Sequence, residues 1–85
     1  MSSGGLFMNI TITNDIFGKN LQALRKKYRL SRIALAKLTG TAAVLIGTWE
    51  DCRVYPTLSP EMVERLCAIF QVTTHELIFE PLEIP

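Results

Sequence analysis

The feature that most constrains this chain is a glycine placed between two short helical patterns. Ser31 is a suitable N-cap for a helix over residues 33–38, and Gly40 can adopt the left-handed backbone that ends a helix. A second helix-length run, TAAVLIGTWE, follows at once. The sequence therefore predicts two short helices joined by a turn of three to four residues.

The second of these helices, predicted over residues 42–50, has two different sides. At 100° per residue, one side carries apolar residues that we expect to face the core, namely Ala42, Leu45, Ile46 and Trp49. The opposite side carries Ala43, Val44, Gly47 and Thr48. This outward side is small and uncharged, and its purpose is the main question that the sequence raises.

Three further helices are predicted around this pair. The first has apolar or aromatic residues at i, i+4, i+7 and i+11, namely Phe17, Leu21, Leu24 and Tyr28. The sequence Ser59-Pro60-Glu61 combines a cap, a proline suited to a first turn and an acidic residue at the positive end of a helix. Thr73-Thr-His-Glu76 is a capping box for a last, short helix. The pattern predicts a compact all-α domain of five helices.

The two ends of the chain are predicted to be extended arms. Residues 1–13 form a flexible or strand-forming arm, because residues 9–13 alternate between apolar and polar side chains. Residues 14–80 form the helical domain, and residues 81–85 form an apolar tail. We expect this tail to pair with the segment around Ile10 and Ile12, within one subunit or between two.

The charge of the chain is strongly polarised although its net value is only +1. Residues 1–43 carry seven basic residues and one acidic residue, whereas residues 44–85 carry two basic and seven acidic residues. A basic half suits phosphate binding, because neutralised phosphates release their counterions. The alternative is an ordinary solvated helix face.

Several functional classes are disfavoured by the composition. Cys52 and Cys67 have neither zinc nor redox spacing, which favours a reduced, cytoplasmic protein. A single histidine, His75, and the lack of a glycine-rich phosphate loop argue against an enzyme, a metal site or a cofactor. We find no apolar stretch long enough to span a membrane and no export signal.

The order of these motifs resembles the phage-repressor family, also called Cro-like or XRE. The matching residues are Leu21-Gln-Ala-Leu-Arg25, Leu30-Ser31, Leu35-Ala36, Gly40, Ile46, Trp49-Glu50, Pro56 and Phe70-Gln-Val-Thr-Thr-His-Glu-Leu77. The resemblance covers residues 16–79 without a gap. It implies a five-helix, helix-turn-helix domain that binds double-stranded DNA, commonly as a homodimer on a palindromic operator, and represses transcription. It also implies a structural ion pair between Arg25 and Glu50.

The family resemblance also assigns the DNA contacts. It places Ala43, Val44, Gly47 and Thr48 in the major groove, and phosphate contacts are predicted for Arg32, Lys37, Thr41 and Arg53. Two turns in which the family often has glycine carry Arg29 and Cys52 instead. The groove-facing positions lack the Arg, Asn or Gln side chains that usually make bidentate bonds to bases.

Two functional readings therefore remain open. The first is a DNA-binding transcriptional regulator that reads bases weakly and is helped by DNA shape. The second is a helix-turn-helix domain that binds a protein partner through an apolar face formed by Ile33, Ala34, Ala43, Val44 and Leu38. Ile33 has a simpler alternative, in which it packs into the core beneath a neighbouring helix.

Overall fold

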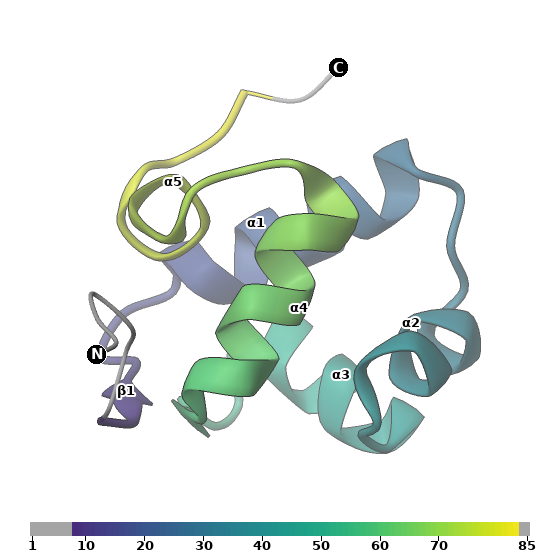
Figure 1. Cartoon of the computed structure of the whole chain (residues 1–85), viewed down its shortest axis with the longest axis horizontal. Helices are drawn as coiled ribbons and strands as arrows, with labels where there is room; N and C mark the ends of the chain where they lie inside the picture. Colours follow the sequence, from purple (N-terminus) through teal and green to yellow (C-terminus); the bar gives the residue numbers. More distant parts are fainter. Residues whose placement is uncertain (1–7, 84–85) are drawn as a thin grey trace, which may run out of the picture.

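The computed structural model describes residues 8–83, and in this part of the chain five helices surround one apolar core (Figure 1). The elements follow one another as β1 (Ile10–Thr11), α1 (Ile16–Lys27), α2 (Arg32–Thr39), α3 (Ala43–Glu50), β2 (Thr57–Leu58), α4 (Pro60–Phe70) and α5 (Thr74–Phe79). The predicted all-α, five-helix architecture is therefore confirmed. The two-residue strand β2 was not predicted.

The helix boundaries follow from the capping residues that the sequence indicated. Ser31 Oγ accepts from the Ala34 backbone N–H at 3.0 Å, and Ser59 Oγ caps α4 in the same way. Thr73 and Glu76 form the predicted capping box of α5. Gly40 has a φ of 72° and ends α2 in the left-handed region, as expected. Each of these signals is local, which is why it can be recognised in the sequence.

The core lies between α1 and the helices that pack against it. In α1, Phe17, Leu21 and Leu24 are buried, and α1 lies against both α3 and α5. Gly18 allows the close approach of α3, because a Cβ at this position would collide with the carbonyl oxygen of Trp49. The packing of α1 therefore fixes where α3, the second helix of the helix-turn-helix unit, can sit.

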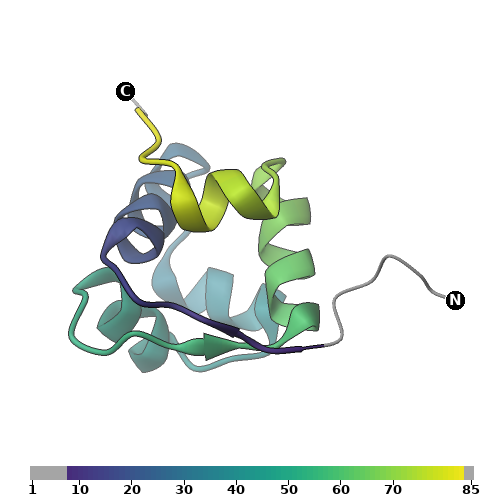
Figure 2. The same cartoon turned by 90° about the vertical axis from the view of Figure 1, so that its left-hand side faces the viewer.

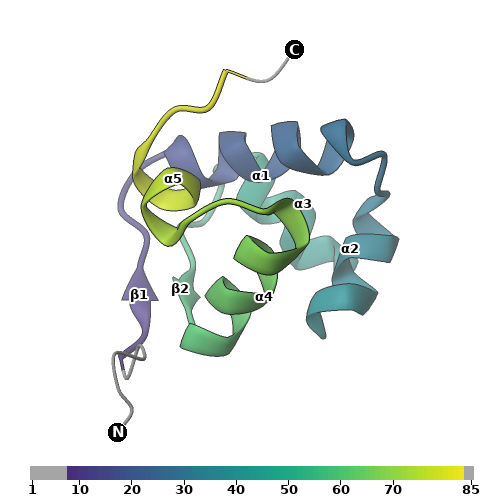
Figure 3. The same ribbon diagram turned by 45° about the horizontal axis from the view of Figure 1, so that its top comes forward.

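The N-terminal arm joins the domain through a small antiparallel sheet. Ile10 pairs with Leu58, and the Ile12 backbone N–H donates to Pro56 O at 2.9 Å, which brings the Ile12 side chain into the core. Figures 2 and 3 show β1 and β2 side by side along one edge of the molecule. The described part of the predicted arm thus forms a short strand, and its Ile12 side chain belongs to the core.

Within one subunit, the described part of the C-terminal tail does not pair with β1, whose partner strand is β2. Pairing of the tail with this segment of a second subunit stays a prediction. The Leu82 backbone N–H instead donates to Asn20 Oδ1 at 3.0 Å. Asn20 Nδ2 also contacts the carbonyl oxygens of Glu76, Leu77 and Glu80 at 2.8–3.1 Å. The buried Asn20 amide therefore satisfies the free carbonyls at the end of α5 and ties the tail to α1. Residues 84 and 85 of the predicted tail lie outside the described residues.

Within residues 8–83, three residues other than glycine adopt the left-handed conformation. Arg29 and Cys52 have φ values of 56° and 58°, in the two turns where the family often carries glycine, and Gln71 has a φ of 55° after α4. A left-handed residue with a Cβ costs about 1 kcal/mol or more. Arg29, Cys52 and Gln71 therefore hold a backbone conformation that glycine adopts most easily, in spite of that cost.

Candidate nucleic-acid interface

The orientation of α3 is set by a buried carboxylate at its last residue. The Glu50 side chain is fully buried, with 0% exposure, and that of Arg25 is 11% exposed. Arg25 Nε donates to Glu50 Oε2 at 2.6 Å, and Arg25 Nη2 donates to Glu50 Oε1 at 2.9 Å. The hydrogen bond to Glu50 raises the pKa of Arg25. The predicted ion pair is therefore present, and it locks α3 to α1.

This ion pair explains why one part of the helical-wheel prediction is wrong. Ile46 and Trp49 are buried as expected, but Leu45 is 43% exposed and Ala42 is exposed at the N-cap of α3. Because Glu50 must face Arg25, the inner side of α3 is centred on residues 46, 49 and 50. Leu45 then lies at the flank of the helix and not in the core.

The four positions predicted to face outward differ in their surroundings. Val44 is 76% exposed and projects from the helix. Ala43 and Thr48 are half-buried, and the Thr48 hydroxyl donates to Val44 O at 2.8 Å, which uses its hydrogen within the helix. Gly47 is buried and does not lie open on this face, because the Arg32 guanidinium covers it.

Arg32 comes from the first turn of α2 and lies against α3. Its Nε donates to Glu50 Oε1 at 3.2 Å, and its Nη2 lies 3.8 Å from Asp51 Oδ1. A Cβ added to Gly47 would lie 3.1 Å from Arg32 Nη1. Arg32 therefore joins α2 to α3 and shares Glu50 with Arg25.

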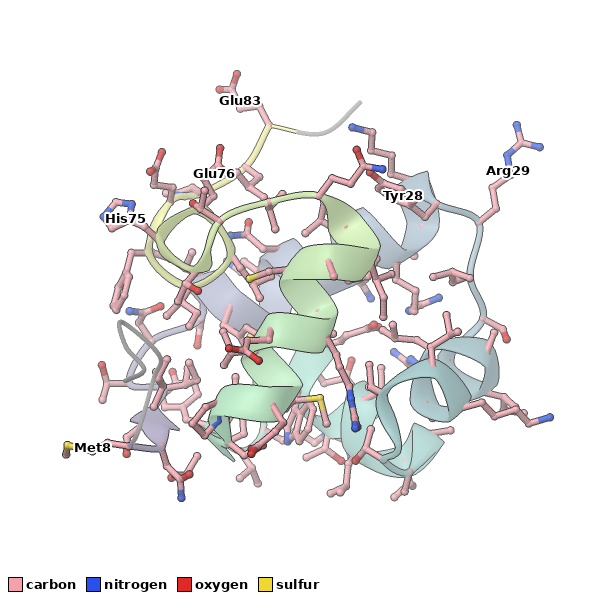
Figure 4. The ribbon with its side chains drawn as sticks, viewed as in Figure 1. Met8, Tyr28, Arg29, His75, Glu76 and Glu83 are labelled. Atoms are coloured by element: carbon pink, nitrogen blue, oxygen red, sulfur yellow. The ribbon has the colours of Figure 1, made fainter. Side chains whose placement is uncertain are left out.

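The other residues predicted to contact phosphate belong to the same helix-turn-helix unit. Lys37 is exposed in the last turn of α2, and Thr41 is half-buried in the turn that follows. Arg53 is exposed after α3, and its Nε lies 3.9 Å from Asp51 Oδ2. Arg29, at the turn between α1 and α2, points away from the domain (Figure 4). Basic side chains are thus present at both ends of the α2–α3 pair.

An apolar surface accompanies these charges on α2 and α3. Its exposed members are Ile33, Leu38, Val44 and Leu45. The alternative in which Ile33 packs into the core is wrong, because 62% of its surface is exposed. We refer to these four residues as the apolar surface.

Membrane-spanning helices and metal-binding clusters were also sought among the described residues. None of their helices has the length and apolar character needed to cross a membrane. Residues 8–83 contain no group of three metal-binding side chains. His75 Nδ1 lies 2.6 Å from Glu80 Oε2 on the exposed side of α5, where Figure 4 shows the ring at the edge of the molecule.

Solved structures with a similar arrangement of helices include a repressor and a DNA-binding domain. The P22 c2 repressor bound to a synthetic operator matches with a TM-score of 0.67 and 28% identity, over 80% of this chain and 98% of that one. The N-terminal DNA-binding domain of SinR from Bacillus subtilis matches with a TM-score of 0.69 and 24% identity, over 82% and 100%. The chain has the fold of the phage-repressor helix-turn-helix family.

A third similar structure is the SinR protein/SinI protein complex, with a TM-score of 0.64 and 25% identity. The match covers 75% of this chain and 61% of the other. The sequence matches no protein-family model, and a search of curated proteins found no significant match. The repressor-like fold therefore rests on the arrangement of the helices together with the motifs quoted above.

The contact between Arg32 and Gly47 was not predicted from the sequence. The two residues are fifteen positions apart on adjacent helices, and nothing local to either one indicates the contact. The missing side chain at position 47, on the outward face of a helix, is the one available signal, because glycine is costly in a helix interior. Such a glycine suggests that another group occupies the space.

Proposed function

We propose that this protein is a DNA-binding transcriptional regulator that acts as a repressor by placing α3 in the major groove. The observation that carries the proposal is the structural likeness, over four fifths of the chain, to the P22 c2 repressor in complex with a synthetic operator. In helix-turn-helix proteins the second helix of the motif lies in the major groove. Here that helix is α3.

Base contacts in this proposal come mainly from Val44, with Ala43 and Thr48 beside it. Val44 is the most exposed of the positions predicted to face bases. Its methyl groups can pack against the C5-methyl of thymine, which is an apolar contact that distinguishes thymine in the major groove. Gly47 adds no side chain of its own, and the Arg32 guanidinium covers it. Recognition of the bases by α3 therefore depends mainly on apolar contacts, and the sequence-dependent shape of the DNA adds to it.

Phosphate contacts are proposed for Lys37, Thr41 and Arg53, which flank α3. Arg32 was predicted as a fourth member of this set; its guanidinium lies against α3, and the side chain is 40% exposed. Each neutralised phosphate contributes about 0.9 to the slope of log affinity against log salt. Three such contacts give a slope of roughly −3 per subunit.

We further propose a cytoplasmic homodimer without enzymatic activity. Repressors of this kind bind two half-sites through a two-fold axis. Exposed apolar side chains away from the apolar surface, namely Val54, Tyr55 and Phe79, are available for a subunit contact. Light scattering at micromolar concentration tests this assembly, and a monomer mass would contradict it.

Fluorescence anisotropy with labelled random duplex DNA tests the function itself. We expect binding at low salt that weakens steeply as salt rises, and the variant Val44→Glu should abolish it through repulsion from the DNA backbone. Lys37→Ala should lower the salt slope by about 0.9. Lys27→Ala is the matched control, because Lys27 is also an exposed lysine but lies at the end of α1, outside α2 and α3. Its Nζ lies 5.9 Å from the centroid of the Tyr28 ring. If the wild-type protein does not bind DNA at low salt, the proposal fails.

A second candidate function is binding of a protein partner through the apolar surface. The exposure of Ile33, Leu38 and Val44 on α2 and α3 favours it, since exposed apolar side chains are a common feature of protein interfaces. Under this function Val44→Glu breaks a protein complex that survives Arg32→Ala. Under DNA binding both variants weaken the interaction with DNA.

A further inference from the structure

Gly47 provides a seat on the outward face of α3 for a side chain that comes from α2. A Cβ at Gly47 would lie 3.1 Å from Nη1, 3.3 Å from Cζ and 3.6 Å from Nε of Arg32. The guanidinium thus occupies the space that an ordinary side chain of α3 would fill. A residue with a side chain at position 47 therefore forces the Arg32 guanidinium to shift, because its Cβ would lie too close to Nη1.

Two carboxylates hold the guanidinium in this seat by one edge. Nε donates to Glu50 Oε1 at 3.2 Å, and Nη2 lies 3.8 Å from Asp51 Oδ1. Within residues 8–83, Nη1 has no hydrogen-bond acceptor, and the Arg32 side chain is 40% exposed. A guanidinium has five N–H donors in a fixed planar fork. Its remaining donors are therefore available in a defined position.

The outward face of α3 needs such donors, because its own residues supply none. Ala43, Val44 and Gly47 have no polar side-chain atoms, and the Thr48 hydroxyl already donates to Val44 O. Arg32 is the basic side chain that lies directly on this face. The Arg32 guanidinium of α2 could therefore supply, on the surface of α3, the hydrogen-bond donors that the side chains of α3 lack.

We propose that Arg32 is a base-reading residue that donates to a guanine in the major groove from its seat on Gly47. The inference rests on the proposed function, since it requires α3 to enter the groove. Guanine presents the neutral acceptors O6 and N7 there, and an arginine fork can donate to both. Arg32 is thereby reassigned from the predicted phosphate contacts to the specific contacts.

The charges around Arg32 favour a base over a phosphate as its partner. Glu50 is shared with Arg25, and Asp51 lies near Nη2 and also near Arg53. These carboxylates reduce the positive potential at Arg32, and a phosphate contact depends on that potential. The N–H donors of Arg32 remain in a fixed direction, and hydrogen bonding to the neutral edge of a base requires only such donors. The carboxylates also hold the side chain in place, so less rotamer freedom is lost when it binds.

Selection of bound duplexes from a random pool tests the proposal with three proteins: wild type, Arg32→Gln and Gly47→Ala. We expect the wild type to select a guanine in each half-site whose replacement weakens binding by roughly 5- to 150-fold. Arg32→Gln should lose this preference or change it to adenine, because glutamine pairs with the adenine edge. Gly47→Ala keeps the charge of Arg32 but forces the guanidinium to shift by a few tenths of an ångström. It should weaken the guanine preference while the salt slope stays unchanged.

Both variants are expected to fold, and this is checked by thermal melting. Arg25 still donates twice to Glu50 in Arg32→Gln, and alanine favours the helix at position 47. If Arg32→Gln weakens binding to every sequence equally and lowers the salt slope by about 0.9, Arg32 contacts phosphate and the proposal is overturned. An unchanged guanine preference in both variants also overturns it. If the wild type binds no duplex at all, the failure lies in the proposed function.

Discussion

Glu50→Gln is expected to be the most damaging conservative substitution in the domain. The Glu50 carboxylate accepts two hydrogen bonds from Arg25 and one from Arg32, and its side chain has 0% exposure. An amide of the same shape keeps one acceptor oxygen but turns an NH₂ group toward a guanidinium. Arg25, at 11% exposure, then becomes a buried charge without a counter-charge.

The expected loss is large compared with the total stability of the chain. Removing one partner of a buried ion pair costs about 3–5 kcal/mol. A domain of 85 residues has a free energy of unfolding of about 4–13 kcal/mol in total. At about 4–8 °C for each kcal/mol, the melting temperature should fall by roughly 12–40 °C.

Urea unfolding followed by circular dichroism and by the fluorescence of Trp49 measures the loss. Trp49 packs against Phe17 with ring centroids 6.2 Å apart, so its emission reports on the contact between α1 and α3. The double variant Arg25→Met/Glu50→Leu is the control, because apolar replacement of a whole ion pair is often nearly neutral. If Glu50→Gln unfolds within about 1 kcal/mol of the wild type, the ion pair does not hold α3 in place and the reasoning is refuted.

Three further predictions concern backbone fit and ionisation. Gly18→Ala forces a Cβ against a backbone carbonyl of α3 and should lower stability by about 1–3 kcal/mol. Gly47→Ala meets the end of the Arg32 side chain, which can shift by a few tenths of an ångström, and should be neutral or stabilising; equal urea midpoints for the two variants would contradict this. Gln71→Gly relieves a left-handed residue and should gain about 0.5–1 kcal/mol, while Gly40→Ala should lose a similar amount, both measured by thermal melting. Burial raises the pKa of the Cys67 thiol above its ordinary value of 9.0, so the unfolded chain loses this proton first and stability falls as pH rises above that value. Urea unfolding at pH 8 and pH 10 should show a smaller fall for Cys67→Ala, and equal falls would exclude this origin.

The sequence predicted those parts of the fold that depend on neighbours along the chain. Ser31, Gly40 and Ser59 act within one turn of their own helices, so their roles can be recognised from spacing. The contact between Arg25 and Glu50 is long-range, and it was predicted only because the order of motifs resembles a family that has it. Leu45 was predicted from the helical wheel to be buried, but it is 43% exposed. The rotation of the short helix α3 about its axis is set by the ion pair between Glu50 and Arg25, which the helical wheel does not take into account.

The candidate site was predicted less completely than the fold. Val44 was expected to face outward, and it does so. The position of Arg32 instead depends on Gly47 and Glu50 of α3 and on Asp51 directly after it, which are distant in the sequence. The pairing of β1 with β2 was missed for a similar reason. The alternation over residues 9–13 indicated a strand at β1, but the two residues of β2, Thr57 and Leu58, are too few to show a pattern, so the partner strand could not be recognised.

The shared space between Arg32 and Gly47 has a consequence for how such proteins diverge. A mutation that gives position 47 a side chain forces the Arg32 guanidinium to shift. A mutation that shortens residue 32 leaves the space above Gly47 unfilled. Either change alone disturbs the binding surface, whereas the two together can replace one specificity with another. Relatives of this chain should therefore change residues 32 and 47 in concert, with small residues at one site accompanying long ones at the other. An alignment of close relatives in which the two sites vary independently would show that no such coupling operates.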